Sequence, residues 1–555
     1  MKLRIKSNGY TRHTELLIKK IRERIPIEES DGGTVITLNV NPSLARAESY
    51  EITATTDGWC ITGACSLGLY YGIGKFLHTA KWSDNVFAPA PPVDIVTPAC
   101  DFRAMYFAVH FYNWYHMAPM KELEEYLVDM LLWGYNTVIT LLPVANIVHW
   151  RDSLHTETEE RLRIIFRLCK QYGIKIGMII NPNQANLASP EELRNVPMEN
   201  LVMRGNLGFN VCLSKPGAME YMRTVWQEQL TCVEGFGLDY VLTWPYDEGG
   251  CGCKNCRPWG ANKYLDGVKY LHDTVRDQYP EAKFIVSTWA FDDPVDEGEY
   301  AGLYRRLDGD MAWVDYLMVD SHGEFPTYVL NHTPLKPIVN FPEISMWGLI
   351  PWGGFGANPL PQRFQSIWNT SKWILNGGMP YSEGLYEDLM KIQFSGYYWN
   401  PDATWEEILG EYIRYEYSPD VTNDVLEMIR CIERNHTHIG NGEEPEISYA
   451  ARGGKLARQV NEKLPARAKN AWRWRVLYIR AILDEKRYAI YPTAYPNDPK
   501  HVKRFSLFSG DLLIDDPEAQ DMFAELQRYY HCVPANGMNH FTLPPLGGTA
   551  HWEEI

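Results

Sequence analysis

Short apolar runs alternate with longer amphipathic stretches through the middle of the chain, from about residue 101 to residue 400. Each run has the length of a buried strand, and the stretches between the runs have helical periodicity. This alternation is typical of parallel strands joined by crossover helices, and eight strands fit a closed barrel better than an open sheet. The predicted strands are 102–110, 137–142, 175–180, 239–244, 283–289, 316–320, 337–341 and 378–381. We therefore predict an α/β fold centred on a (β/α)8 barrel.

The two ends of the chain have different patterns. The N-terminal end is predicted to form strand, helix, two strands and helix over 3–6, 14–25, 34–40, 50–61 and 67–78. A proline-rich linker at 88–92 follows, because proline can neither continue a helix nor donate to a sheet. After residue 399 the pattern is almost wholly helical to about residue 528, and the clearest predicted helices are 405–417, 425–434, 466–487 and 517–530. The predicted domains are an α/β domain at 1–95, the barrel at 96–400, and a helical domain with a tail at 401–555.

Composition narrows the class of partner. A net charge of −17 argues against nucleic acid, because phosphate binding needs clustered lysine and arginine. Aromatic residues make up 13% of the chain, and flat amphipathic rings suit a carbohydrate partner. The first residues lack the apolar stretch of a signal peptide and no segment is long enough for a membrane span, so we expect a soluble cytoplasmic protein with no membrane partner. The oligomeric state stays open, with a homodimer as one option.

Active sites of such barrels form at the carboxyl ends of the strands. The residues that follow the predicted strands are unusually polar and aromatic. Any one of them has a plain alternative, since an acid can cap a helix and a tryptophan can fill the upper core. The candidate substrate-binding residues are His110, Asn113, Trp114, Asn181, Trp244, Tyr246, Trp289, Asp320, His322, Trp347, Tyr381 and Glu383.

Two carboxylates on opposite sides of a barrel mouth suit glycoside cleavage, in which one protonates the leaving oxygen and the other attacks the sugar. Glu248 after the fourth strand is the predicted acid/base, and Glu343 after the seventh is the predicted nucleophile of a retaining glycoside hydrolase. In a second mechanism Asp247 orients a substrate acetamido group as internal nucleophile while Glu248 donates the proton. A barrel that binds carbohydrate without catalysis is a third possibility.

Three cysteines, Cys251, Cys253 and Cys256, lie within six residues just after the predicted acid. Together with Cys212, on the neighbouring loop, they could hold one tetrahedral zinc ion. A closed site of four cysteines leaves no open position for chemistry, so the zinc is predicted to be structural and catalysis to need no cofactor. The alternative is a set of reduced thiols without metal.

Several of these segments resemble known glycosidases over roughly residues 1–400. The stretches 50–52 and 68–73 look like the accessory domain of family 20 hexosaminidases and family 67 α-glucuronidases. The segment 98–103 is similar to the first strand of family 20, and the resemblance implies that Arg103 binds sugar hydroxyls. The pair Asp247-Glu248 is similar to the acidic end of the family 20 fourth strand, although Pro245 and Tyr246 replace the two glycines found there.

The cysteine cluster resembles that of family 42 β-galactosidases, in which four cysteines around the fourth-strand acid hold zinc. Those enzymes have Asn-Glu where this chain has Asp247-Glu248. The spacing of the last three cysteines also resembles bacterial barrels related to family 163 endo-β-N-acetylglucosaminidases. These resemblances imply a glycosidase without fixing the sugar.

Overall fold

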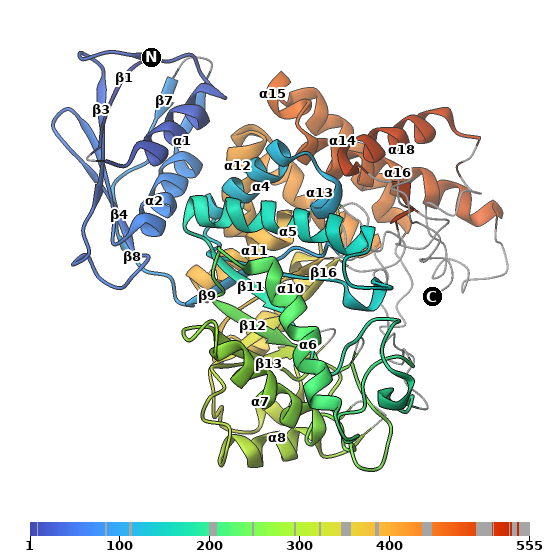
Figure 1. The fold of residues 1–555 in the computed structure, drawn as a ribbon. Coiled ribbons are helices and arrows are strands. Elements are labelled where there is room, and N and C mark those ends of the chain that lie inside the picture. Colours follow the sequence, from blue (N-terminus) through green and yellow to red (C-terminus); the bar gives the residue numbers. More distant parts are fainter. Residues whose placement is uncertain are drawn as a thin grey trace.

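The structure is a computed structural model that describes residues 1–7, 9–83, 86–109, 114–198, 208–246, 249–292, 296–320, 324–345, 357–382, 388–435, 447–494, 513, 515–531, 533–534 and 541–542. Figure 1 shows three regions: a blue N-terminal sheet with its helices, a central barrel, and a group of orange-to-red helices. Among the described residues, no helix is both long enough and apolar enough to cross a membrane.

The N-terminal region is a six-stranded sheet in the order β2-β1-β3-β5-β4-β8. The single predicted strand 50–61 is wrong, because it is an antiparallel pair that turns between Ala54 and Gly58. The sheet also extends beyond the proline-rich linker by one strand. Its elements are β1 (Lys2–Ser7), α1 (Thr11–Arg22), β2 (Glu28–Glu29), β3 (Thr34–Val40), β4 (Tyr50–Ala54), β5 (Gly58–Gly63), α2 (Ser66–Thr79), β6 (Lys81–Ser83), β7 (Val86–Ala88) and β8 (Val93–Val96).

Eight parallel strands close the central barrel in the order β10-β11-β12-β13-β14-β15-β17-β9, which confirms the predicted fold class. Strands such as the second, with the sequence TVITL, are buried along their whole length, as expected for a parallel sheet covered by helices. In chain order the strands are β9 (Phe102–Tyr106), β10 (Thr137–Leu141), β11 (Lys175–Ile179), β12 (Tyr240–Thr243), β13 (Lys283–Ser287), β14 (Tyr316–Asp320), β15 (Ile338–Phe341) and β17 (Leu375–Gly378).

The eighth strand lies earlier in the chain than predicted. Gly377 has a φ of 128°, and a Cβ atom there would lie 1.7 Å from the carbonyl oxygen of Phe102. Only glycine allows this close approach between the eighth and first strands, so a sequence that looks like a turn closes the barrel. Tyr381, predicted to end this strand, instead belongs to β18 (Tyr381–Ser382), which pairs with β16 (Glu343–Ser345).

Helices surround the barrel with their apolar faces turned toward the strands. Helix α5 begins at a side-chain cap, in which Asp152 accepts a hydrogen bond from the backbone N–H of His155, and ends at the left-handed Gly173. The helices of this region are α3 (Trp114–Met117), α4 (Met120–Leu132), α5 (Ser153–Tyr172), α6 (Ala218–Leu230), α7 (Lys263–Arg276), α8 (Glu299–Leu307), α9 (Thr327–Leu330), α10 (Pro361–Ser371) and α11 (Asp388–Trp399).

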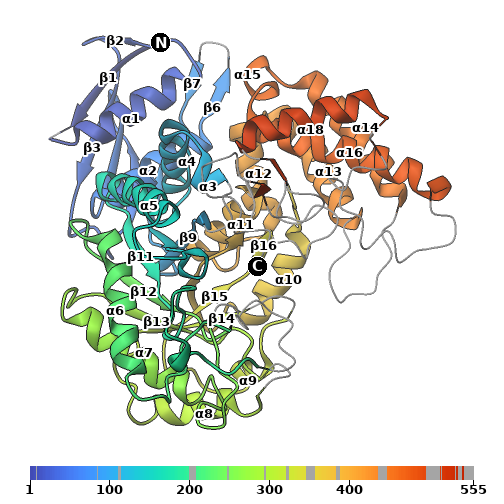
Figure 2. The same cartoon turned by 45° about the vertical axis from the view of Figure 1, so that its right-hand side comes forward.

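The C-terminal region is helical, as predicted, and in Figure 2 its helices gather beside the barrel on the side of α11 and β16. Helix α10 of the barrel contacts both α12 and α13, so this region joins the barrel wall after the seventh strand. The predicted helix 466–487 is two helices that break between Lys469 and Trp472. The elements are α12 (Trp405–Glu416), α13 (Thr422–Asn435), α14 (Ile447–Lys463), α15 (Ala466–Lys469), α16 (Trp472–Ala494), α18 (Pro517–Tyr530), β19 (Val533–Pro534) and β20 (Phe541–Thr542).

Candidate active site

Aromatic rings connect the ends of the fourth, seventh, eighth and first strands across the barrel mouth. The ring of Trp244 lies 5.0 Å from that of Phe341, edge to face, and Phe341 lies 4.9 Å from Tyr381. Tyr381 in turn stacks on Tyr106 with 5.2 Å between ring centroids. These spacings are typical of attractive ring pairs. The carboxyl ends of the fourth and seventh strands, which are three strands apart around the barrel, therefore meet in one place.

Glu343 stands at this meeting place. It is 5% exposed and pairs in register with Tyr381 through the short β16–β18 extension of the barrel. The guanidinium of Arg363, on α10, lies close enough for the charges of Glu343 and Glu433 to act on it, although burial dominates and lowers the pKa of Arg363. Glu433 belongs to α13 and accepts hydrogen bonds from the backbone N–H groups of Gln362 and Arg363. The C-terminal helices thus support the wall behind Glu343.

Asp247 and Glu248 lie outside the described residues, but amide side chains hold the chain firmly on both sides of them. Before the pair, the backbone N–H of Trp244 donates to Asn181 Oδ1 at 2.9 Å. After it, Asn183 clamps Gly250, because its Oδ1 accepts from the Gly250 N–H at 3.1 Å and its Nδ2 donates to the Gly250 carbonyl at 2.9 Å. Asn195 donates to the same carbonyl at 2.9 Å. The loop after the third strand therefore fixes the loop after the fourth.

Tyr246 is buried, with 1% exposure, and its hydroxyl donates to Glu299 Oε1 at 2.5 Å. Burial raises the pKa of this tyrosine far above its usual value, so the hydroxyl stays a proton donor. The hydroxyl is therefore bonded to the first residue of α8. Tyr246 was predicted to bind substrate, and the structure shows its side chain buried with the hydroxyl bonded to Glu299.

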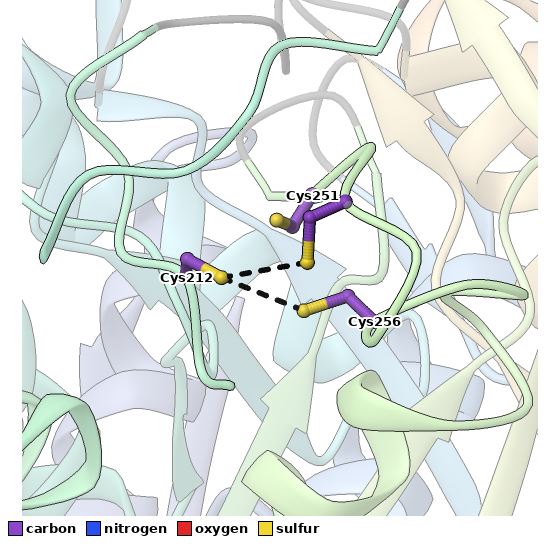
Figure 3. A group of neighbouring side chains, drawn as sticks. Cys212, Cys251 and Cys256 are labelled. Carbon is purple, nitrogen blue, oxygen red and sulfur yellow. Dashed lines mark hydrogen bonds between the residues drawn. The ribbon is translucent and has the colours of Figure 1, made fainter. Parts of the chain in front are cut away.

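The four predicted metal ligands come together. The sulfur atoms of Cys212, Cys251, Cys253 and Cys256 all lie within 4.8 Å of one another. Figure 3 shows Cys212 facing the loop that carries Cys251 and Cys256. The Cys212 sulfur is 3.6 Å from that of Cys253 and 3.8 Å from that of Cys256. Four sulfurs at 2.3 Å from a tetrahedral zinc would be about 3.8 Å apart, so the residues fit this metal.

The thiols also influence one another's ionisation. Hydrogen bonds from Cys251 and Cys256 lower the pKa of Cys212. The interaction with Cys212 raises the pKa of both Cys251 and Cys256. Without a cation, four adjacent thiolates would repel one another, and a divalent metal is the usual way in which proteins offset that repulsion.

Other predicted residues have mixed placements. Trp289 is 7% exposed at the end of the fifth strand, and Asp320 is the last residue of the sixth. Trp114 is 2% exposed and packs edge to face on Tyr126, 5.1 Å away, so it fills the upper core, as its alternative interpretation allowed. The remaining candidates lie outside the described residues, namely His110, Asn113, His322, Trp347 and Glu383.

The expectation that Arg103 binds sugar hydroxyls is wrong. Arg103 lies near the amino end of the first strand, at the opposite end from the mouth, and its side chain is fully buried. Its guanidinium donates to Glu48 at 2.5 Å and to the carbonyls of Gly134 and Cys100, each at 2.7 Å. Because Glu48 belongs to the N-terminal sheet region, Arg103 joins that region to the barrel.

Two groups of this site were not predicted. Glu299 follows an acidic stretch and starts a helix, which in sequence indicates only a favourable charge at the helix N-terminus. Asn195 is far from any strand end, and no sequence pattern connects it to Gly250.

A cavity of about 730 Å³ lies between the N-terminal region, the barrel and α12, near the barrel's amino end, where Lys75 pairs with Glu411. It includes none of the predicted catalytic residues.

Fold and site together define a (β/α)8 barrel with an N-terminal α/β region, a C-terminal helical region and a four-cysteine cluster beside the fourth strand. No family model and no curated protein sequence matches the chain.

Solved structures of glycoside hydrolases share this architecture. A family GH115 4-O-methyl-α-glucuronidase aligns over 97% of this chain and 78% of its own, with a TM-score of 0.59 and 12% identity. A Clostridium perfringens GH89 enzyme in complex with GlcNAc-α-1,4-galactose aligns over 91% and 65%, with a TM-score of 0.62 and 11% identity. A GH20 β-N-acetylhexosaminidase from Streptomyces coelicolor A3(2) aligns over 75% and 91%, with a TM-score of 0.51 and 12% identity. At these identities the likeness shows the fold.

Proposed function

We propose that the protein is a retaining glycoside hydrolase, with Glu248 as acid/base and Glu343 as nucleophile. The observation that carries the proposal is the contact between Trp244 and Phe341, with ring centroids 5.0 Å apart. These residues stand four positions before Glu248 and two before Glu343. A pair of carboxyl groups on facing walls, about 5 to 5.5 Å apart, is what retention of configuration requires.

The surroundings of the pair support this assignment. Glu343 is buried beside Tyr381, and the amides of Asn181 and Asn183 hold the chain on both sides of Glu248. Fixed supporting groups of this kind keep catalytic side chains within a fraction of an ångström of their working positions. The structures that share the fold are named as enzymes acting on glucuronides or on N-acetylated sugars, so a substrate of either class is consistent with the architecture.

The N-acetylated substrates named for the GH89 and GH20 structures favour one second candidate. In it, Asp247 orients the acetamido group of an N-acetylhexosaminide, which attacks in place of Glu343. Both candidates use Glu248 as the acid. They differ in whether an enzyme carboxylate forms a covalent bond to the sugar.

A structural zinc ion bound by Cys212, Cys251, Cys253 and Cys256 completes the proposal. The sulfur spacings of 3.6 and 3.8 Å support it, because they match the edges of a zinc–thiolate tetrahedron. The ion would link the loop after the third strand to the loop that carries Glu248. All four ligands are thiolates, so it would take no part in the chemistry.

The test measures hydrolysis of a panel of aryl glycosides, including glucuronides and N-acetylhexosaminides, by two active-site variants and one control variant. Glu248→Gln should lower kcat/KM by about 10²- to 10⁴-fold on substrates with poor leaving groups, and much less on activated ones, because only poor leaving groups need protonation. Glu343→Gly should lose activity and recover it with azide, giving a glycosyl azide of inverted configuration.

The matched control is Asp239→Asn, which changes a carboxylate at the amino end of the same fourth strand. Asp239 accepts a hydrogen bond from the Ile176 N–H at 2.8 Å, and asparagine can still accept it, so activity should remain. Wild-type rates in Glu248→Gln would remove Glu248 from the mechanism. An active Glu343→Gly that forms no azide product would favour the acetamido mechanism, and binding without hydrolysis across the panel would favour a non-catalytic barrel.

A further inference from the structure

One buried carboxyl group joins the two ends of the loop that follows the fourth strand. Glu299, the first residue of α8, is completely buried. Its Oε1 accepts from the Tyr246 hydroxyl at 2.5 Å and from the Gly260 N–H at 2.5 Å. Tyr246 and Gly260 bracket residues 247–259, which include Glu248 and three of the four clustered cysteines. A single oxygen atom therefore closes the base of this loop.

Further hydrogen bonds, made by Trp259 and Asp296, connect the two ends of the same loop. The Trp259 indole N–H donates to the Pro245 carbonyl at 2.5 Å, directly across the loop. Asp296, three residues before Glu299, accepts from the Trp259 N–H at 3.0 Å and from Arg257 Nε at 2.6 Å. The segment that starts α8 thus binds both ends of the loop, in addition to the bonds that Asn183 makes to Gly250.

The close contact with Glu299 explains why residue 260 is a glycine. A Cβ atom there would lie 2.6 Å from Glu299 Oε1 and 2.3 Å from the ring of Phe291. Neither group can move freely, because the Glu299 carboxyl is bound on three sides and Phe291 is 6% exposed. The close approach of backbone to carboxyl group requires glycine at this position.

The charged groups near Glu299 lie in the segment that leads into α8. Its Oε2 accepts from the Asp292 N–H at 3.2 Å, and Asp292 Oδ1 accepts from the Glu299 N–H at 2.7 Å. Asp292 and Asp296 are the charged neighbours, and in the described part of the chain Glu299 has no ion pair with a cation. Burial raises the pKa of Glu299 to about 7, although the three hydrogen bonds oppose this shift.

We propose that Glu299 is a positioning residue for the proton-donating Glu248: through Tyr246 and Gly260 it fixes the loop that presents this acid to the leaving group. The proposal rests on the function proposed above. It assigns Glu299 no contact with substrate. Its effect is therefore expected on steps that need a well-placed proton donor and on no others.

The test compares kcat/KM on two aryl glycosides of the sugar that the panel identifies, one with 2,4-dinitrophenolate and one with 4-methylphenolate as leaving group. Glu299→Ala and Tyr246→Phe should lower kcat/KM about 10- to 100-fold on the 4-methylphenyl substrate, because a donor displaced by about an ångström transfers its proton poorly. On the dinitrophenyl substrate, which needs no proton, the change should stay within about threefold. Glu299→Gln, which keeps an acceptor oxygen, should restore much of the lost rate.

Tyr71→Phe is the matched control, because it removes a buried tyrosine hydroxyl that donates to the Tyr135 carbonyl at 3.2 Å, near the barrel's amino end. It should leave both rates unchanged. Equal losses on both substrates, or no loss in either variant, would overturn the role of Glu299. If Glu299→Ala fails to fold, Tyr246→Phe decides alone. If Glu248→Gln also shows no leaving-group dependence, the proposed function fails as well, so the two failures are distinguishable.

Discussion

At the scale of single residues, a buried carboxyl group with no cation beside it favours its protonated form. The pKa of Glu299 is raised to about 7, mainly by burial, whereas an unfolded glutamate ionises near 4.5. Between these values the folded protein binds more protons than the unfolded chain, so this residue makes stability fall as pH rises through that window.

Glu299→Gln removes the titration, since glutamine stays neutral. Relative to this variant, the wild type should lose at most about 3 kcal/mol of unfolding free energy between pH 5 and pH 8. Urea unfolding of both proteins at the two pH values measures the difference. Gln393→Ala, at a buried amide that does not titrate, is the control: it keeps Glu299, so its difference in stability from the wild type should be the same at both pH values. A difference that stays constant with pH would contradict the raised pKa.

Site residues could be predicted where they lie close together in the sequence or directly after a strand. They could not be predicted where their role depends on contacts between distant parts of the chain. The four cysteines were found because three of them crowd into six positions. Arg103 was misassigned because sequence does not show that Glu48, 55 residues away, neutralises it inside the protein. Glu299 was missed for the same reason, as its partners Tyr246 and Gly260 lie on a loop that comes earlier in the chain.

At the scale of elements, the loop after the fourth strand is held on two sides, by amides of the third loop and by the start of α8. The four thiols provide a third connection, between Cys212 and the segment 251–256. If zinc occupies the cluster, its binding energy adds directly to the stability of this connection. The loop should then lose its order when the metal is removed, while the barrel strands remain.

Cys212→Ser tests this expectation. The wild type should contain about one zinc ion per chain, and the variant should bind zinc at least about 100-fold more weakly because one thiolate ligand is lost. Activity should fall with the zinc content, and amide exchange should increase in the third and fourth loops. Cys60→Ser, at a half-buried thiol of the N-terminal sheet, is the control. Purified wild-type protein without stoichiometric zinc would exclude the metal.

The regular elements were mostly predictable, because apolar periodicity marks buried strands and amphipathic helices. Three differences have local causes. A turn between Ala54 and Gly58 divides one predicted strand, and Ala471 lies in a break that divides one predicted helix. The eighth strand was placed too late because Gly377 and Gly378 look like a turn, although their lack of side chains is what lets the barrel close.

At the scale of the whole molecule, a buried ion-pair cluster around Glu48 helps to fasten the N-terminal region to the barrel, in addition to the pair of Lys20 with Asp129. Glu48 accepts from Arg103 at 2.5 Å, from Asn136 at 3.1 Å and from Lys175 at 3.4 Å. Its backbone has a φ of 68°, which a residue with a side chain rarely adopts, so the surrounding contacts must hold it there. Burial opposes ionisation, but Arg103 and Lys175 outweigh it and lower the pKa of Glu48.

Glu48→Gln leaves the fully buried Arg103 without its counter-charge and should reduce the unfolding free energy at pH 7 by about 3 kcal/mol. Because the pKa of Glu48 is lowered, its contribution is present above about pH 4.5 and is lost as the pH falls through the lowered value. The difference from wild type should therefore shrink in acid, which urea unfolding at pH 7 and pH 3 can measure. Glu51→Gln, on the same sheet but outside the cluster, should have little effect at either pH. The folded variant should keep its activity, because the cluster lies at the opposite end of the barrel from Glu343; a large loss of kcat with unchanged stability would show that the N-terminal region acts on the mouth.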